Sequence, residues 1–312
     1  MNATDDSSHL VWHYTTSSGL LGMIRHRELW ATHSRFMNDK VEGSVMHSAI
    51  KAFLSDTTTL TPAQMSMVEL QYSFLTANAY PTYTRVPQGN MFLVCGSRDN
   101  DALTLWRNYA REAVSFAVGL DPKVPLGVIT SNKSPSGNWH DVMHWRDVDY
   151  TSVFDNLPCH HRERLVNAAR SEDPGDQIVN VSRELQRILS GVKHNAFVDE
   201  RETRIAYFND DPRDWEFRAG RFGLTPYLRI GTSEQWGRSS DGEDNLPIRA
   251  IRVSANATDA DIMAVHALLE GHGFTFGEIY EDRASDDGAI GPVVTGYEDP
   301  IPVVQSQHPL RG

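Results

Sequence analysis

Cysteine and long hydrophobic runs are the features that the sequence most clearly lacks. Its 312 residues include only two cysteines, Cys95 and Cys159, too few for the disulfide framework of a small secreted domain. No run of about 18 apolar residues indicates a membrane-spanning helix, and no hydrophobic secretory signal is visible. We therefore expect a cytoplasmic protein with no membrane partner.

Basic residues are also in the minority. The 29 Lys and Arg residues against 41 Asp and Glu residues give a formal net charge of -12. A nucleic-acid phosphate backbone would meet net repulsion, because such binding depends on Lys and Arg replacing counterions. The charge disfavours a protein that coats nucleic acid, while a local basic groove stays compatible with it. With 40% hydrophobic and 22% charged residues, the composition is that of an ordinary globular protein.

The signatures of several large enzyme classes are absent: a Walker phosphate loop, G-x-G-x-x-G, H-E-x-x-H and G-x-S-x-G. The pairs His140 with His144 and His160 with His161 would need a further ligand to bind a metal, and scattered surface histidines explain them better. Neither cysteine combines a nearby histidine with the helix-cap geometry that marks a thiolate nucleophile. We expect neither a metal site nor a catalytic cysteine.

What the sequence does contain is a regular alternation of short apolar runs and helical spacings. Leu20, Leu21, Ile24 and Leu29 recur at the spacing of one helix face, with Ser17 and Ser18 as capping residues. The predicted strands cover residues 10–12, 29–32, 90–97, 113–120, 127–129, 140–150, 196–198, 203–208, 248–253 and 274–280. The predicted helices cover residues 19–29, 41–54, 62–77, 99–111, 159–192 and 259–272.

This order of elements favours an α+β fold with several insertions in one domain. We expect a disordered N-terminus over residues 1–10, the domain over 11–285 and a loop-rich tail over 286–312. The segment 209–247 is rich in Gly and Pro, and we interpret it as a long surface connection or a lid.

Polar residues of chemical interest gather in four places. These are His13-Tyr14-Thr15 at a predicted strand end, Arg35 to Asp39 with Glu42, Trp106 to Tyr109 on a predicted helix, and Lys193, Phe197, Glu200, Glu202 and Arg204.

The last of these places has the most informative spacing. Glu200, Glu202 and Arg204 are two residues apart, so on a strand all of them point to one face. Such charges are costly to bury unless they bind something. The alternative is an edge strand that exposes them to water as a ladder.

The other places have structural alternatives as well. Considered by itself, His13 is also consistent with a structural histidine that is held by hydrogen bonds. Trp106 and Tyr109, at an i, i+3 spacing, are explained by core packing as readily as by a ligand cage.

Taken in order, these motifs resemble those of a bacterial family of uncharacterised domains. That family opens with H-Y-T before a G-L-L-G-I-type helix, continues with N-D-x-x-E and D-x-x-x-x-W-x-x-Y, and ends with K-x-x-x-F-x-x-E-x-E-x-R. Here the motifs are His13-Tyr14-Thr15, Asn38-Asp39 with Glu42, Asp101 with Trp106 and Tyr109, and Lys193 through Arg204. The resemblance covers residues 11–280. Thr203 departs from it, because the family usually has Trp there.

The same layout more distantly resembles that of ADP-ribosyltransferases, including toxins that modify DNA bases. The resemblance implies a split, mostly antiparallel central sheet flanked by helices. It also implies that NAD is a substrate, that an early His contacts a ribose, that an aromatic ring stacks on nicotinamide, and that a late Glu holds a ribose hydroxyl beside the breaking bond.

Mapped onto this chain, the resemblance makes Glu202 and Glu200 the expected catalytic residues. Glu202 would stabilise the cation formed when the glycosidic bond breaks, and Glu200 would orient the acceptor or act as its base. An arginine would pair with the pyrophosphate. The expected NAD-binding residues are His13, Tyr14, Thr15, Arg35, Asn38, Trp106, Arg107, Tyr109 and Arg204.

The sequence therefore favours an NAD-dependent ADP-ribosyltransferase that modifies a protein or a nucleic acid. The family's bacterial setting suggests a toxin or phage-defence effector, for which an antitoxin or other partner protein is expected. Two alternatives stay open: a non-catalytic nucleotide-binding or sensing module, and a metal-assisted nuclease or hydrolase built on Glu42, Asp101, Glu200 and Glu202.

Overall fold

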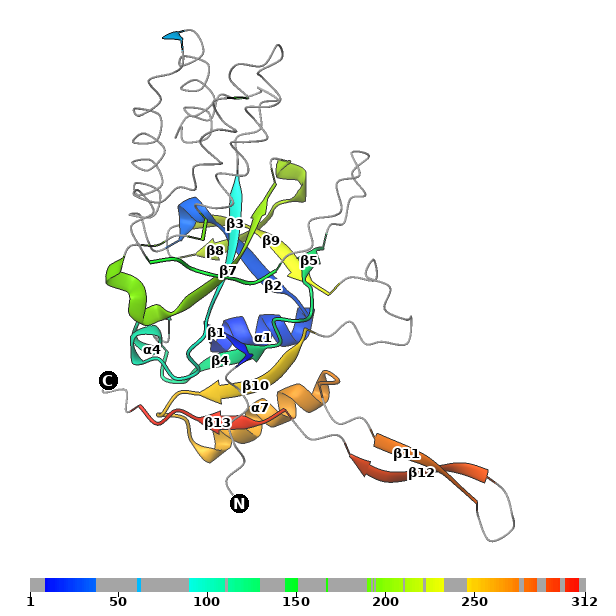
Figure 1. The fold of residues 1–312 in the computed structure, drawn as a ribbon. Coiled ribbons are helices and arrows are strands. Elements are labelled where there is room, and N and C mark those ends of the chain that lie inside the picture. The colour runs from blue at the N-terminus through cyan, green and yellow to red at the C-terminus, as the bar shows by residue number, and fades with distance from the viewer. Residues whose placement is uncertain are drawn as a thin grey trace. The chain divides into compact units, whose positions relative to one another are not determined.

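In the computed structural model the chain divides into two compact units. Figure 1 labels the helices and strands along the chain. The first comprises Met1–Glu28, Gly96–Val124 and Gly231–Gly312, and the second comprises Leu29–Cys95 and Pro125–Ile230. The residues that the structure describes are 9–37, 61–62, 90–109, 112–129, 144–150, 167, 190–191, 193, 195–209, 211–220, 223–232, 246–274, 278–284, 290–297 and 301–308.

The first unit is built on a mainly antiparallel sheet. Its strands are β13 (Val303–Gln305), β10 (Ile248–Val253), β4 (Ser115–Leu120) and β1 (Val11–Thr16), in that order, and only β13 and β10 run parallel. All six residues of β4 are buried, as expected for a strand with neighbours on both edges and both faces covered. A separate antiparallel ribbon consists of β11 (Glu278–Ala284) and β12 (Ile290–Tyr297).

Three helices are described in this unit. Helix α1 (Ser17–His26) buries Leu20, Met23 and Ile24, which lie on one face at helical spacing. Its N-cap is Thr16, whose side chain accepts a hydrogen bond from the Gly19 amide, so the expectation of Ser17 or Ser18 as cap was one or two residues late. Helix α4 (Leu103–Tyr109) precedes β4 along the chain, and α7 (Asp259–Gly271) starts with a capping box between Thr258 and Asp261.

The strand pairs whose register is described in the second unit are antiparallel. Strand β2 (Leu29–His33) pairs with β3 (Met91–Ser97) on one side and with β9 (Gly223–Gly231) on the other. Strand β9 also pairs with β8 (Glu216–Gly220) and lies next to β5 (Gly127–Val128). Strand β7 (Glu202–Phe208) pairs with β3 and with β6 (Arg146–Asp147). Short 3-10 helices are η2 (Ser34–Phe36), η4 (Asn195–Glu200) and η5 (Pro212–Asp214).

Strand β3 belongs to both units along the chain. Leu93 and Phe92 pair with β2 in the second unit, and Ser97 pairs with Trp12 of β1 in the first. The described fold is thus mixed, with few helices and a mostly antiparallel open sheet, which confirms that part of the prediction.

Several element predictions are confirmed and others are corrected. The strands at 90–97, 113–120, 203–208 and 248–253 and the helix at 259–272 are present within one or two residues of the predicted bounds. The predicted strand at 196–198 is wrong, because these residues lie in η4. The helices predicted at 41–54, 62–77 and 159–192 lie almost wholly outside the described residues.

The Gly-rich segments hold more structure than we expected. The interval 209–247 contains β8 and β9, joined by a tight hairpin whose Gly223 has φ of 98°. Here the glycine marks a hairpin turn, since it adopts a conformation that L residues with side chains avoid. Strands β12 and β13 likewise lie in the stretch that we predicted to be mostly loop.

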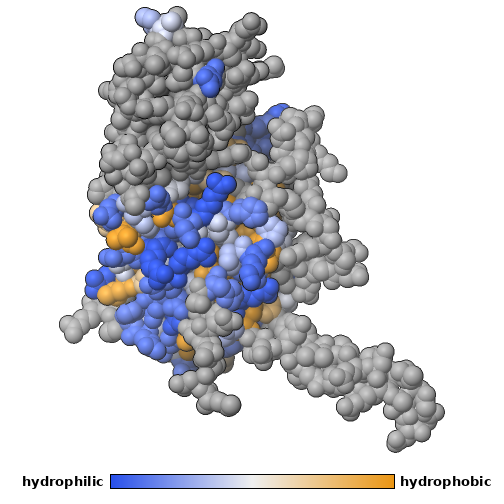
Figure 2. All heavy atoms as spheres, viewed as in Figure 1, coloured by the Kyte–Doolittle hydropathy of each residue, from blue (hydrophilic) through white to orange (hydrophobic). Residues whose placement is uncertain are grey.

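Each unit buries aromatic and aliphatic side chains. In the first, Trp12, Tyr14 and Trp106 pack with small and aliphatic neighbours, and in the second Phe92, Ile205, Leu228 and Ile230 are almost inaccessible. Hydrophilic residues dominate the described surface on the face in Figure 2, with small hydrophobic groups among them. Within the described ranges, no helix has both the length and the apolar character needed to cross a membrane.

Candidate functional site

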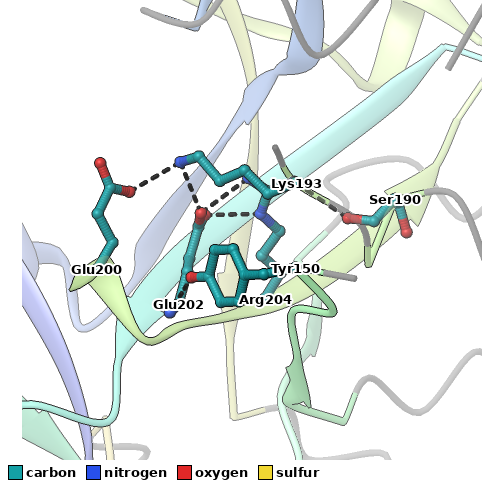
Figure 3. A network of polar contacts seen from close by, with 6 residues as sticks. All are labelled: Tyr150, Ser190, Lys193, Glu200, Glu202 and Arg204. Carbon is teal, nitrogen blue, oxygen red and sulfur yellow. Dashed lines mark hydrogen bonds and ion pairs between the residues drawn. The ribbon is translucent and has the colours of Figure 1, made fainter. Parts of the chain in front are cut away.

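The most concentrated group of charged side chains lies in the second unit, where η4 leads into β7. We call Lys193, Glu200, Glu202 and Arg204 the buried charge network, because each is at most 6% exposed (Figure 3). The exposed ladder considered from the sequence is therefore excluded.

The local backbone brings the two glutamates together in an unexpected way. Glu200 ends η4, and Arg201 has φ of 41°, in the left-handed region that residues other than glycine rarely adopt. Strand β7 then starts at Glu202. Only Glu202 and Arg204 thus share a strand face, and our expectation that Glu200 lies on the same strand is wrong.

The Glu202 carboxylate is surrounded by donors. Arg204 donates from Nε to Oε1 over 2.6 Å and from Nη2 to Oε2 over 2.8 Å, a two-pronged contact that matches the geometry of a carboxylate. Lys193 Nζ donates to Oε2 over 2.8 Å, and the Cys95 thiol provides a further hydrogen bond.

Lys193 links the two glutamates. Its Nζ lies 2.8 Å from Oε2 of Glu200 as well as from Oε2 of Glu202, and 4.8 Å from the centre of the Phe197 ring. With Arg204, the network contains two cations and two anions and is neutral as a whole. This balance allows the four side chains to be buried, because leaving one buried charge without its partner would lower the free energy of unfolding by about 3–5 kcal/mol.

Backbone groups hold the network in place. The Glu202 amide donates to the Tyr150 hydroxyl over 2.7 Å, and Arg204 Nη1 donates to the Ser190 carbonyl over 3.1 Å (Figure 3). The amide of Val148 donates to the Glu202 carbonyl, which adds a rung beside β6. Tyr150, Ser190 and Cys95 were not expected from sequence, because they are distant along the chain and no local spacing points to them.

The electrostatics fix the ionisation of this group. Burial raises the pKa of Glu202, but Arg204 and Lys193 outweigh it and lower that pKa to about 2. Burial lowers the pKa of Lys193, and the two carboxylates more than reverse this, so it ends above its ordinary value. Burial raises the pKa of Tyr150. At neutral pH Glu202 is an anion and Lys193 a cation.

The expected site residues of strand β1 point to two different faces. Trp12 and Tyr14 are buried on one face, whereas His13 and Thr15, offset by one residue, are only partly buried. Tyr14 accepts a hydrogen bond from the Ala102 amide over 2.8 Å and donates to the Asp99 carbonyl over 3.0 Å. Burial raises the pKa of the Tyr14 phenol.

Helix α4 carries the remaining aromatic residues. Trp106 is fully buried, and its ring meets that of Tyr14 edge-on with centroids 4.9 Å apart. Tyr109 is partly buried against the same cluster, and Arg107 is exposed. Tyr109 is therefore partly accessible, and Trp106 is not.

Asp101 organises a second polar network in the first unit. Its carboxylate accepts hydrogen bonds from Trp106 Nε1 over 2.8 Å, from the Ser306 hydroxyl over 2.5 Å and from the Gln307 amide over 3.0 Å. Arg252 Nη1 lies 3.6 Å away. Burial raises the pKa of Asp101, and these hydrogen bonds and Arg252 bring it below its ordinary value.

The structure therefore assigns the expected residues to different units. His13, Tyr14, Thr15, Trp106, Arg107 and Tyr109 belong to the first, and Glu200, Glu202 and Arg204 to the second. Arg35 lies in the second, but its side chain, like Asn38, Asp39 and Glu42, lies outside the described residues. That His13, Tyr109 and Glu202 serve one NAD molecule stays a prediction.

A protein metal site needs several ligands from His, Cys, Asp or Glu side chains. In the part of the chain that the structure describes, no three such side chains gather as they would around a metal ion. His144 is exposed, and His140, His160, His161 and Cys159 fall outside the described residues.

The chain was compared with family models, curated proteins and solved structures. No family model, no curated protein and no solved structure matches the chain.

Proposed function

We propose that the protein is an NAD-dependent ADP-ribosyltransferase that modifies a macromolecular acceptor. The observation that supports it most is the pair of buried carboxylates, Glu200 and Glu202, held on one lysine two residues apart in sequence. The resemblance of the motif order to that of ADP-ribosyltransferases motivates the assignment, and the fold proposed with it is ADP-ribosyltransferase-like.

The proposed chemistry assigns Glu202 an electrostatic role. When the bond between nicotinamide and ribose C1′ breaks, its electron pair leaves with nicotinamide and positive charge develops on the ribose. A carboxylate with a pKa of about 2 stays ionised and stabilises that charge, whereas it is too weak a base to take a proton efficiently.

Glu200 has the complementary role in the proposal. The acceptor nucleophile forms its bond to C1′, and Glu200 takes the proton that the nucleophile loses. Glu200 is buried and shares Lys193 with Glu202. In Figure 3 its second carboxylate oxygen points away from the other residues drawn.

Among the proposed NAD-binding residues, the contacts favour some over others. Tyr109 suits ring stacking better than Tyr14, whose phenol is occupied by two backbone hydrogen bonds. Arg204 is committed to Glu202 and Ser190, so exposed Arg107 is the better partner for a pyrophosphate. His13 and Thr15, on the partly buried face of β1, keep their proposed contact with ribose.

A nucleotide-binding module without catalysis is the second proposal. The observation that favours it is that the Glu202 carboxylate already accepts four hydrogen bonds, from Lys193, from two nitrogens of Arg204 and from Cys95. A substrate hydroxyl could donate to this carboxylate only if one of these donors moved away. Either activity suits a bacterial toxin or phage-defence effector, which would have an antitoxin or another protein as partner.

One experiment separates the two. The purified full chain is incubated with NAD labelled in its adenosine, together with bacterial protein, RNA or denatured DNA, and both label transfer and free nicotinamide are measured. A transferase yields both products, and Glu202→Gln lowers the transfer rate by about 100-fold or more. Glu200→Gln lowers the rate while the KM for NAD changes little.

Glu270→Gln is the matched control, because Glu270 is an exposed glutamate on α7. Circular dichroism shows whether each variant is folded. Binding of NAD without release of nicotinamide supports the binding module instead. Equal transfer by the wild type and both buried-glutamate variants would show that these carboxylates are not catalytic.

A further inference from the structure

A second chemical feature of the second unit lies on the partly exposed face of strands β2, β9 and β8. Along β2, Leu29, Ala31 and His33 are buried, while Trp30 and Thr32 are only partly buried. Trp30 lies opposite Arg229 and Thr32 opposite Tyr227, and antiparallel partners point to the same face. We call Trp30, Thr32, Arg218, Tyr227 and Arg229 the aromatic–arginine face.

The rings and a guanidinium on this face are stacked on one another. The Trp30 and Tyr227 centroids are 4.9 Å apart, with ring planes at 36°. Arg218 Cζ lies 5.3 Å from the Trp30 ring centre and 5.9 Å from that of Tyr227. Its Nη2 donates to Thr32 Oγ1 over 2.8 Å. The guanidinium thus lies near both rings, fixed by its hydrogen bond to Thr32, and the Arg218 side chain is only partly exposed.

Arg218 differs from Arg204 of the buried charge network, which is paired with Glu202, in its described surroundings. Among the described residues no carboxylate forms an ion pair with it. Burial lowers the pKa of Arg218, which shows that the charged form of this side chain is partly desolvated. The buried charge of Arg204, in contrast, is balanced by the Glu202 carboxylate. A partly desolvated cation with unfilled donors gains most from a bound anion.

We propose that the aromatic–arginine face binds single-stranded nucleic acid, with bases stacking on Trp30 and Tyr227 and phosphates pairing with Arg218 and Arg229. Open sheet faces with aromatic rings and arginines suit unpaired bases, because every base has a flat surface to stack on. Glu216 lies opposite Tyr227, so the described residues named for these strands include two arginines and one carboxylate. With a chain charge of -12, contact is confined to a few nucleotides. This inference is independent of the proposed transferase activity.

The test measures the fluorescence anisotropy of a labelled 12-nucleotide oligothymidylate as the full chain is added at low salt. Arg218→Ala is expected to weaken binding about tenfold, and Arg218→Lys by less, because lysine keeps the charge and loses the plane. Trp30→Leu removes the stacking surface and is expected to weaken binding by about tenfold or more. The logarithm of affinity should fall with that of salt with a slope of about -1.4, since each phosphate contributes about -0.7.

Arg249→Ala is the control, because Arg249 is 56% exposed on β10 in the other unit and its loss changes the net charge equally. It should leave the affinity unchanged. Equal weakening by Arg249→Ala and Arg218→Ala would overturn the site in favour of diffuse charge attraction. AMP, inorganic phosphate and unlabelled oligonucleotide are also compared as competitors at equal concentrations of phosphate. If AMP or phosphate competes as well as the oligonucleotide, the face does not bind an extended strand, and the proposal is overturned. No binding of the oligonucleotide by folded wild type at about 20 mM salt, where electrostatic binding is strong, would overturn the proposal outright.

Discussion

The two polar networks of the molecule, one in each unit, are built on opposite principles. The buried charge network around Glu202 pairs two cations with two anions, all within residues 193–204. The network around Asp101 has one carboxylate that receives neutral donors from positions as distant as Ser306 and a longer contact of 3.6 Å with Arg252. The first depends on exact charge balance, whereas the second depends on hydrogen bonds at a partly accessible site. Their responses to the loss of one charge should therefore differ.

The largest effect is expected for Glu202→Gln. The amide keeps the shape of the side chain but leaves Lys193 and Arg204 with one anion between them. The free energy of unfolding should fall by about 3–5 kcal/mol, the range for breaking a buried ion pair. Urea unfolding at pH 7 measures it, with Glu270→Gln as a control expected to stay within about 0.5 kcal/mol of wild type. A loss below 1 kcal/mol would mean that water reaches the network.

Acid should weaken the same network through Glu202. Its pKa is about 2 in the folded protein against an ordinary 4.5, so the unfolded chain takes up the proton first as pH falls. The stabilisation is complete above about pH 4.5 and disappears as pH falls through 2. Between pH 7 and pH 3 the advantage of wild type over Glu202→Gln should shrink by roughly 2 kcal/mol. An advantage that stays constant over this range would show that folding does not lower the pKa of Glu202.

The same contrast explains what could be predicted from sequence. Local spacing identified Lys193, Glu200, Glu202 and Arg204 because they lie within one short segment. It did not identify Tyr150 or Cys95, which reach Glu202 only through strand pairing and packing. The spacing also led us to place Glu200 on the strand, because the sequence does not indicate that the backbone at Arg201 has a positive φ.

At the level of the fold, strands with continuous apolar runs, such as β3 and β4, were predictable because their periodicity is clear. Strands β8 and β9 were missed, since Gly220, Gly223 and Pro226 resemble loop residues until their hairpin is seen. In the Asp101 network, the motif resemblance had grouped Asp101 with Trp106, but nothing in the sequence indicated Ser306, because residues 101 and 306 are joined by tertiary structure alone.

The smallest effect is expected for Asp101→Asn, which tests the other side of the comparison. The amide oxygen can still accept from the indole of Trp106 or from Ser306, so most of the hydrogen bonding survives. What is lost is the hydrogen bond from the Gln307 amide to Oδ2, at an exposed position, and the charge opposite Arg252, at 3.6 Å and partly screened by water. We expect the free energy of unfolding to fall by only about 1 kcal/mol, measured by urea unfolding beside Glu202→Gln. A loss as large as that of Glu202→Gln would mean that the charge of Asp101, rather than its hydrogen bonds, holds Ser306 and Gln307 in place, and the distinction between the two networks would fail.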